Sequence, residues 1–390
     1  MIAPGGLISL AFSEHMLKNW QYYLRIYSEN SLQCWDKTIL LRVGSLIDAR
    51  HSFCAVNEQL DPDLINAFGT AAPPPGDYLL HLAPGWDRNL IETPVLLVHG
   101  AGLDATSYTN LYNMGFTGLQ QQLTARGYRV FSLTFSHSHG DNHHQAEVLA
   151  HAIQQVKELS GVRKINIIAH SKGGFAARIY LSNLALTPYR DDVGHYIMLG
   201  TPNLGTDYSF RYPGLGYLIY LAGGNGVIAW HKLLHMGSFI DISSRAIYRE
   251  GSFPGQCQML YPWAEEFPLD ISQQDWWTTY YGGTGFISCS RGLQTAMNDG
   301  GHLVQKLESR GLEPDITFAV LAGDNSILGL TPAPDSIPGD GIVFVDSVLN
   351  TAGMSRRGAV LREKTTLPLN HMELLYDSRV TGWIHRQLNG

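Results

Sequence analysis

The chain has 390 residues, of which 44% are hydrophobic and 16% are charged. This composition excludes a disordered chain, and the length suits one large domain with insertions better than two ordinary domains. The formal net charge is −7 and no cluster of Lys and Arg is present, so we expect no nucleic-acid partner.

The N-terminus lacks the pattern of a secretory signal. Residues 1–12 are largely apolar, but the first Lys or Arg is Lys18, on the wrong side of that run. The apolar runs are also shorter than the roughly 20 residues of a membrane-spanning helix. We therefore expect no transmembrane segment and a cytoplasmic location, with an extracellular one as the alternative. No pattern specifies an oligomeric state.

Residues 1–75 are interpreted as an N-terminal extension packed on or preceding the core. They contain an amphipathic segment at 13–27, a strand-like run at 38–43 and a Pro-rich loop at 69–76. The cysteines lack C-x-x-C spacing and are expected to be core residues. A bridge between Cys257 and Cys289 is the alternative if the protein is exported. The four cysteines are Cys34, Cys54, Cys257 and Cys289.

Residues 76–390 are interpreted as the main domain. From Pro94 onward, short apolar runs alternate with helix-compatible stretches, which predicts a doubly wound, mostly parallel sheet. The expected strands lie at 95–98, 128–133, 165–168, 196–199, 316–321 and near 359–362. The alternation breaks at about 203–290, where aromatic residues are dense, and we interpret this stretch as an insertion. It forms either a small subdomain core or a lid over the site.

Ser171 follows the apolar run 165–168 and is flanked by the small residues Ala169 and Gly173. A strand that turns sharply into a helix crowds those flanking positions and presents the serine Oγ at the edge of the sheet. The pattern therefore predicts a nucleophile elbow. The backbone amides of Ala101, after an earlier strand, and of Lys172 are predicted to form an oxyanion hole. The Lys172 side chain is expected to be solvated.

A serine nucleophile needs a base, and the base needs a group that fixes its tautomer. Asp340 in Gly339-Asp340-Gly341 and His371 in Asn370-His371 follow Ser171 in the order Ser, Asp, His. We favour Asp340 as the acid. Its main rival is Asp324, at the end of an expected strand, and two lower-ranked candidates are Asp335 and Asp346.

These motifs resemble bacterial triacylglycerol lipases and related carboxylesterases of the α/β-hydrolase superfamily, from about residue 94 to the C-terminus. The matching residues are Val98–Ala101, Ala169–Gly173, Gly200–Pro202, Asp340–Val343 and Asn370–His371. The resemblance implies an α/β-hydrolase fold and a hydrophobic ester substrate, including one at a lipid–water interface. In many such lipases a calcium ion braces the loop of the base, which makes Asp324 and Glu373 candidate ligands.

A loop at the end of an expected strand is rich in histidine, a composition that suits metal binding. Its spacing matches no closed zinc pattern, and we favour a solvated polar loop beside the site over a zinc-dependent hydrolase. The candidate ligands are His137, His139, Asp141, His143 and His144.

The predicted function is hydrolysis of carboxylic esters by Ser171, His371 and Asp340 through an acyl-enzyme, with no cofactor required. A polyester depolymerase or acyltransferase with the same triad is the alternative, because a triad does not determine the acyl acceptor. A non-catalytic binding protein of the same fold is a remote alternative.

Overall fold

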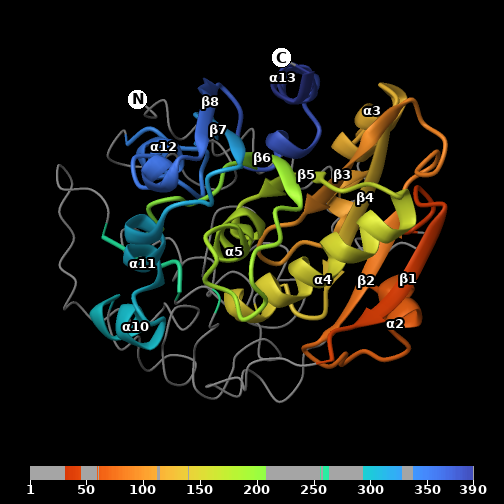
Figure 1. The fold of residues 1–390 in the computed structure, drawn as a ribbon, viewed down its shortest axis with the longest axis horizontal. Helices are drawn as coiled ribbons and strands as arrows, with labels where there is room; N and C mark the ends of the chain where they lie inside the picture. The colour runs from red at the N-terminus through yellow and green to blue at the C-terminus, as the bar shows by residue number, and fades with distance from the viewer. Residues whose placement is uncertain are drawn as a thin grey trace, which may run out of the picture.

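A computed structural model describes residues 31–44, 59, 61–111, 115–138, 140–207, 255, 258–262, 293–326 and 337–389. Its centre is an eight-stranded sheet with the order β1-β2-β4-β3-β5-β6-β7-β8 (Figure 1). The strands are β1 (Lys37–Arg42), β2 (Asp77–Leu82), β3 (Ile91–Val98), β4 (Tyr128–Phe135), β5 (Ile165–His170), β6 (Val193–Leu199), β7 (Thr317–Gly323) and β8 (Val360–Leu367).

The predicted parallel sheet is confirmed in the run β4-β3-β5-β6-β7-β8, within which neighbouring strands pair in parallel. The expected runs at 95–98, 128–133, 165–168, 196–199 and 316–321 all lie on these strands, with boundaries shifted by a few residues. The run at 38–43 forms β1, which pairs antiparallel with β2. β2 was not among the predicted strands; it is buried along its whole length and pairs antiparallel with β4.

Helices connect the strands and pack on the sheet. α4 and α5 contact each other and pack on β3, β4 and β5, whereas α3 and α13 contact each other and pack on β4 and β6 (Figure 1). The helices are α2 (Pro62–Phe68), α3 (Leu119–Ala125), α4 (Asn142–Ser160), α5 (Lys172–Leu181), α10 (Leu293–Asp299), α11 (Leu303–Arg310), α12 (Val345–Leu349) and α13 (Ser378–Asn389). None of the helices in the described ranges is long and apolar enough to span a membrane.

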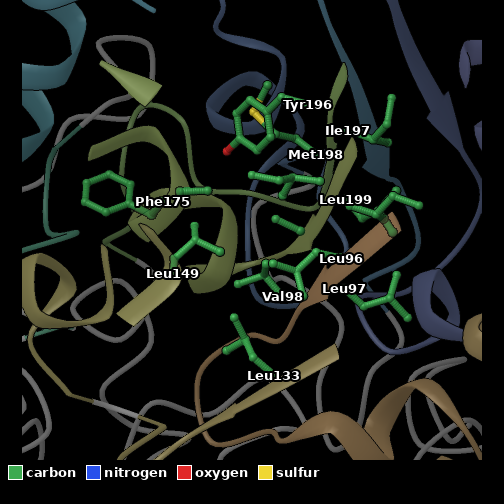
Figure 2. Close-up of a cluster of buried hydrophobic side chains, with 14 of the residues drawn as sticks. Leu96, Leu97, Val98, Leu133, Leu149, Phe175, Tyr196, Ile197, Met198 and Leu199 are labelled. Atoms are coloured by element: carbon green, nitrogen blue, oxygen red, sulfur yellow. The ribbon is translucent and has the colours of Figure 1, made fainter. Parts of the chain in front are cut away.

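The main core lies between the sheet and its helices. Alternate residues of a strand point to opposite faces, and on β6 Tyr196 and Met198 point toward the side of α5 while Ile197 points away (Figure 2). The Tyr196 hydroxyl donates to the Gly174 carbonyl of α5 at 2.5 Å. Phe175 lies on the same side and is fully buried. Apolar contacts thus hold α5 firmly against the central strands.

Several sequence-based predictions fall outside the described residues. These are the amphipathic segment 13–27, the state of Cys54, Cys257 and Cys289, and most of the insertion at 203–290. Cys34 is described and is a free, half-buried thiol. The division near residue 75, the lid and the disulfide alternative stay predictions.

Candidate active site

Ser171 lies between the end of β5 and the start of α5, as expected for an elbow. Its φ is +52°, a conformation that non-glycine residues rarely adopt, and the residue is only 7% exposed. A Cβ added at Gly173 would lie 2.3 Å from the His99 carbonyl oxygen, and one at Gly174 would lie 2.0 Å from Thr201 Oγ1. Both glycines are therefore required for α5 to approach the ends of β3 and β6.

The loop after β3 lies directly against the elbow. A Cβ added at Gly100 would lie 2.8 Å from Ser171 Cβ. His99 is buried: its Nδ1 donates to the Gly100 carbonyl at 2.9 Å, and its Nε2 accepts from the Phe135 amide at 3.1 Å. Burial lowers the pKa of His99 to about 4, so the ring is neutral at pH 7. Because the Gly100 carbonyl shares a peptide plane with the Ala101 N–H, His99 orients the predicted oxyanion donor.

Asp340 and His371 are in direct contact, 31 residues apart in the sequence. Asp340 Oδ2 and His371 Nδ1 are 2.6 Å apart, and both side chains are almost completely buried. The other carboxylate oxygen accepts from the amides of Ile342 at 3.0 Å and Val343 at 2.7 Å. The His371 amide also donates to the Asp340 carbonyl at 2.9 Å. An aspartate held this rigidly keeps the proton on Nδ1 and leaves Nε2 as the basic nitrogen.

Neighbours of Ser171 bring this pair to the elbow. His170 Nε2 lies 3.0 Å from the His371 carbonyl, and the two rings are 4.4 Å apart between centroids. A Cβ added at Gly200, after β6, would lie 3.1 Å from both Asp340 Oδ2 and His371 Cε1. The Ser171 amide donates to Leu199 at 2.9 Å. Ser171 follows β5, Asp340 follows β7 and His371 follows β8, so the ends of these parallel strands bring the three residues to one edge of the sheet, as expected for this topology.

The rival acids do not contact His371 in the described residues. Asp324 follows β7 with an exposed side chain, and its amide donates to the Leu367 carbonyl at 2.8 Å. Asp346 is exposed in the first turn of α12. Asp335 lies outside the described residues. The geometry therefore favours Asp340.

The Lys172 side chain is not solvated, contrary to our expectation. It is 1% exposed, and its Nζ donates to Gln145 Oε1 of α4. Burial lowers the pKa of Lys172 well below its ordinary value, and the Asp141 carboxylate acts against this shift. No local sequence pattern indicates this burial, because Gln145 and Lys172 are 27 residues apart.

The histidine-rich stretch is only partly a loop. Asp141 caps α4 by accepting from the amides of His143 at 2.7 Å and His144 at 3.2 Å, so these two histidines belong to the first helical turn. His137 lies in the preceding loop, and His139 is outside the described residues. No group of three or more His, Cys, Asp or Glu side chains suited to a metal ion occurs in the part of the chain that the structure describes.

Glu373, the other calcium candidate, has a structural contact. Its carboxylate accepts from the Asn370 amide at 2.7 Å, and Asn370 Oδ1 accepts from the Glu373 amide at 2.9 Å. This reciprocal pair braces the turn that carries His371. Calcium binding by Glu373 and Asp324 stays a prediction.

Comparison with known proteins shows which family the chain belongs to. The model of a family described as "Alpha/beta hydrolase family" matches residues 95–306. Two triacylglycerol lipases, from Pseudarthrobacter phenanthrenivorans and Burkholderia plantarii, are each 32% identical to the chain over 120 residues. That match covers 30% of this chain and 35% and 31% of the two relatives, so the chain spans about a third of their length.

Solved structures resemble the chain at low sequence identity. The mature form of the Bacillus licheniformis lipase BlEst2 is 14% identical with a TM-score of 0.47, covering 81% of this chain and 98% of that one. The carboxylesterase CesB from Bacillus subtilis is 12% identical with a TM-score of 0.44, covering 97% and 99%.

Proposed function

Because the chain belongs to the alpha/beta hydrolase family, we propose that it is a serine hydrolase that cleaves carboxylic esters with a triad of Ser171, His371 and Asp340. The observation that carries the proposal is the buried 2.6 Å contact between His371 Nδ1 and Asp340 Oδ2. It supplies an oriented base beside a serine in a strained turn, which is the arrangement that activates a hydroxyl nucleophile.

In the first half-reaction Ser171 Oγ attacks the ester carbonyl carbon while His371 Nε2 takes the hydroxyl proton. The carbonyl electron pair moves to oxygen, where the amides of Ala101 and Lys172 stabilise the negative charge. The intermediate collapses, and the alcohol leaves with the proton from His371. Water then attacks the acyl-enzyme in the same way, releasing the acid and restoring Ser171.

The substrate is proposed to be an acylglycerol-like or other hydrophobic ester. The similarity to two triacylglycerol lipases supports this class, although it extends over only part of each relative. A triad alone does not select the acyl chain.

The test is hydrolysis of p-nitrophenyl esters from acetate to palmitate by the wild type and Ser171→Ala. We expect the wild type to release nitrophenol and to be labelled by a fluorophosphonate, with Ser171→Ala losing both properties. Because substitution of the nucleophile removes the acyl-enzyme route, the rate should fall by about 10⁶-fold. Hydrolysis by Ser171→Ala at the wild-type rate would refute the proposal, and the chain-length profile of the wild type separates esterase from lipase preference.

A further inference from the structure

Lys172 connects the elbow to a part of the chain that the triad does not use. It is the first residue of α5, and its amide belongs to the first turn, where N–H groups have no partner within the helix. That amide is the proposed oxyanion donor, whereas the side chain extends to Gln145 of α4. A movement of Gln145, which holds the Lys172 side chain, would therefore reach the Lys172 backbone amide within the same residue.

Gln145 is itself held in place. Its Nε2 donates to the His137 carbonyl at 2.8 Å, which leaves Oε1 to accept from Lys172 Nζ. Gln145 is 4% exposed. The two partners thus determine the orientation of the Gln145 side-chain amide. This orientation places Oε1 toward Lys172 Nζ.

One described part of the insertion packs against the Lys172 side chain and the start of α4. We call residues 255 and 258–262 the docked segment. A Cβ added at Gly255 would lie 2.3 Å from Lys172 Cε and 2.1 Å from the Gly140 carbonyl. The docked segment therefore lies so close to the lysine stem that only glycine fits at position 255.

Polar contacts attach the docked segment to the start of α4. Asn142 Nδ2 donates to the Gly255 carbonyl, and the Asn142 amide donates to Gln258 Oε1, both at 2.8 Å. Gln258 Nε2 donates to Asp141 Oδ2 at 2.7 Å. Gln258 is buried, so breaking these bonds would leave polar groups without partners.

Among the described residues, the charged and titratable groups that interact with the lysine are Asp141, His137 and His99. The Asp141 carboxylate is the opposite charge that favours the ammonium form. Burial, to which the charge of Lys172 adds, lowers the pKa of His137 to about 3, and burial lowers that of His99 to about 4. Both histidines are therefore neutral at pH 7. An apolar side chain of the same length would avoid the desolvation of an amine, so the amine needs a role that packing alone does not provide.

We propose that the Lys172 side chain is a positioning residue through which the docked segment and α4 hold the oxyanion donor in place. The expected effect on kcat rests on the proposed ester hydrolysis. The coupling between Gln258, Gln145 and Lys172 does not depend on that activity, because it arises from the contacts of the fold. The insertion is then part of the catalytic scaffold at this point, in addition to any contact it makes with substrate.

The kinetic test compares Lys172→Met, Gln258→Leu and the double variant, with kcat expressed per site titrated by fluorophosphonate. We expect kcat of each single variant to fall about 10- to 100-fold, because small misplacement of a transition-state donor acts on kcat. KM should change less than about threefold. The double variant should lose little more than the larger single loss, since both changes release the same anchor. Lys164→Met and Gln154→Leu, on the surface, are the matched controls and should retain wild-type kcat.

Two kinetic outcomes would overturn the inference: wild-type kcat per titrated site in Lys172→Met, or independent, multiplying losses in the double variant. Hydrogen exchange separates these from a failure of the proposed function. In Gln258→Leu, amides of residues 171–174 should exchange at least about fivefold faster than in Gln154→Leu. If the wild type hydrolyses no ester, the proposed function fails while exchange still decides the coupling. Unchanged exchange at the elbow would refute the coupling whatever the activity.

Discussion

Ser171 shows how much of the candidate site depends on single residues. Its backbone has a positive φ at the turn from β5 into α5. Gly173 and Gly174 then allow α5 to approach the His99 carbonyl after β3 and the Thr201 side chain after β6. The small residues around the serine were predicted from local sterics. The distances to His99 and Thr201 give the physical reason, because a side chain at either glycine would push α5 away from the sheet.

The proposed choice of the acid can also be tested at this scale. We expect Asp340→Asn to lower kcat by about 10⁴-fold, because an amide that donates to Nδ1 would reverse the tautomer of His371. Asp324→Asn should keep near-wild-type activity, since its exposed side chain has no contact with His371 among the described residues. Esterase assays on both variants, after checking the fold by circular dichroism, test this. A larger loss of activity in Asp324→Asn than in Asp340→Asn would show that Asp340 is not the acid of the triad.

At the scale of elements, α5 carries the nucleophile at one end and a buried cation further along. Arg178 Nη1 donates to the Asn203 carbonyl at 2.6 Å, and its Nη2 lies 3.2 Å from Glu308 of α11. Asn203 Nδ2 in turn donates to the Val348 carbonyl of α12 at 2.6 Å. Arg178 thus ties α5 to the segment after β6 and to two later helices.

Arg178→Met should lower the free energy of unfolding by about 3 kcal/mol, because it removes the buried partner of a part-buried ion pair with Glu308 and leaves the Asn203 carbonyl unsatisfied. Urea unfolding monitored by tryptophan fluorescence measures the change. Arg379→Met is the matched control. Its ion pair with Asp377 is solvent-exposed, so unfolding should stay close to that of the wild type. Equal destabilisation by the two variants would contradict this role of Arg178.

At the scale of the whole molecule, buried neutral histidines couple stability to pH. His81 lies between Thr38 and Thr134 with ring nitrogens 2.9 and 2.8 Å from their hydroxyls. Burial lowers the pKa of His81 to about 3 and that of His99 to about 4. Below pH 6.5 the unfolded chain takes up a proton on each ring, whereas the folded protein does not.

The folded state should therefore lose stability as the pH falls from 6.5 toward 4, by about 1.4 kcal/mol per pH unit for each such histidine. Urea unfolding at pH 7, 6 and 5 measures this slope above the range in which most carboxylates titrate. His81→Gln should reduce this slope by about 1.4 kcal/mol per pH unit, the contribution of one titrating histidine. A slope that is unchanged in this variant would show that His81 is not the neutral, buried group described.

Much of the fold could be predicted from the sequence because its signals are local. The runs that form β3, β5 and β6 are contiguous apolar segments between helix-compatible stretches, and the small residues around Ser171 lie within five positions. β2 was missed because its fully buried sequence Asp77–Leu82 follows a Pro-rich loop and contains Asp77, whose charge is paired with Arg42 of β1. That pairing is visible only when the two strands are side by side.

The sequence by itself determined the order Ser171, Asp340, His371 and the parallel strands whose ends carry those residues. Only the tertiary structure decided that Asp340 rather than Asp324 contacts His371, and that Lys172 is buried against Gln145 and Gly255 instead of solvated. The reason is the sequence separation of the interacting residues. A nucleophile elbow depends on backbone sterics within a few residues. The Asp340–His371 contact and the burial of Lys172 depend on which distant segments the closed chain brings within hydrogen-bonding distance.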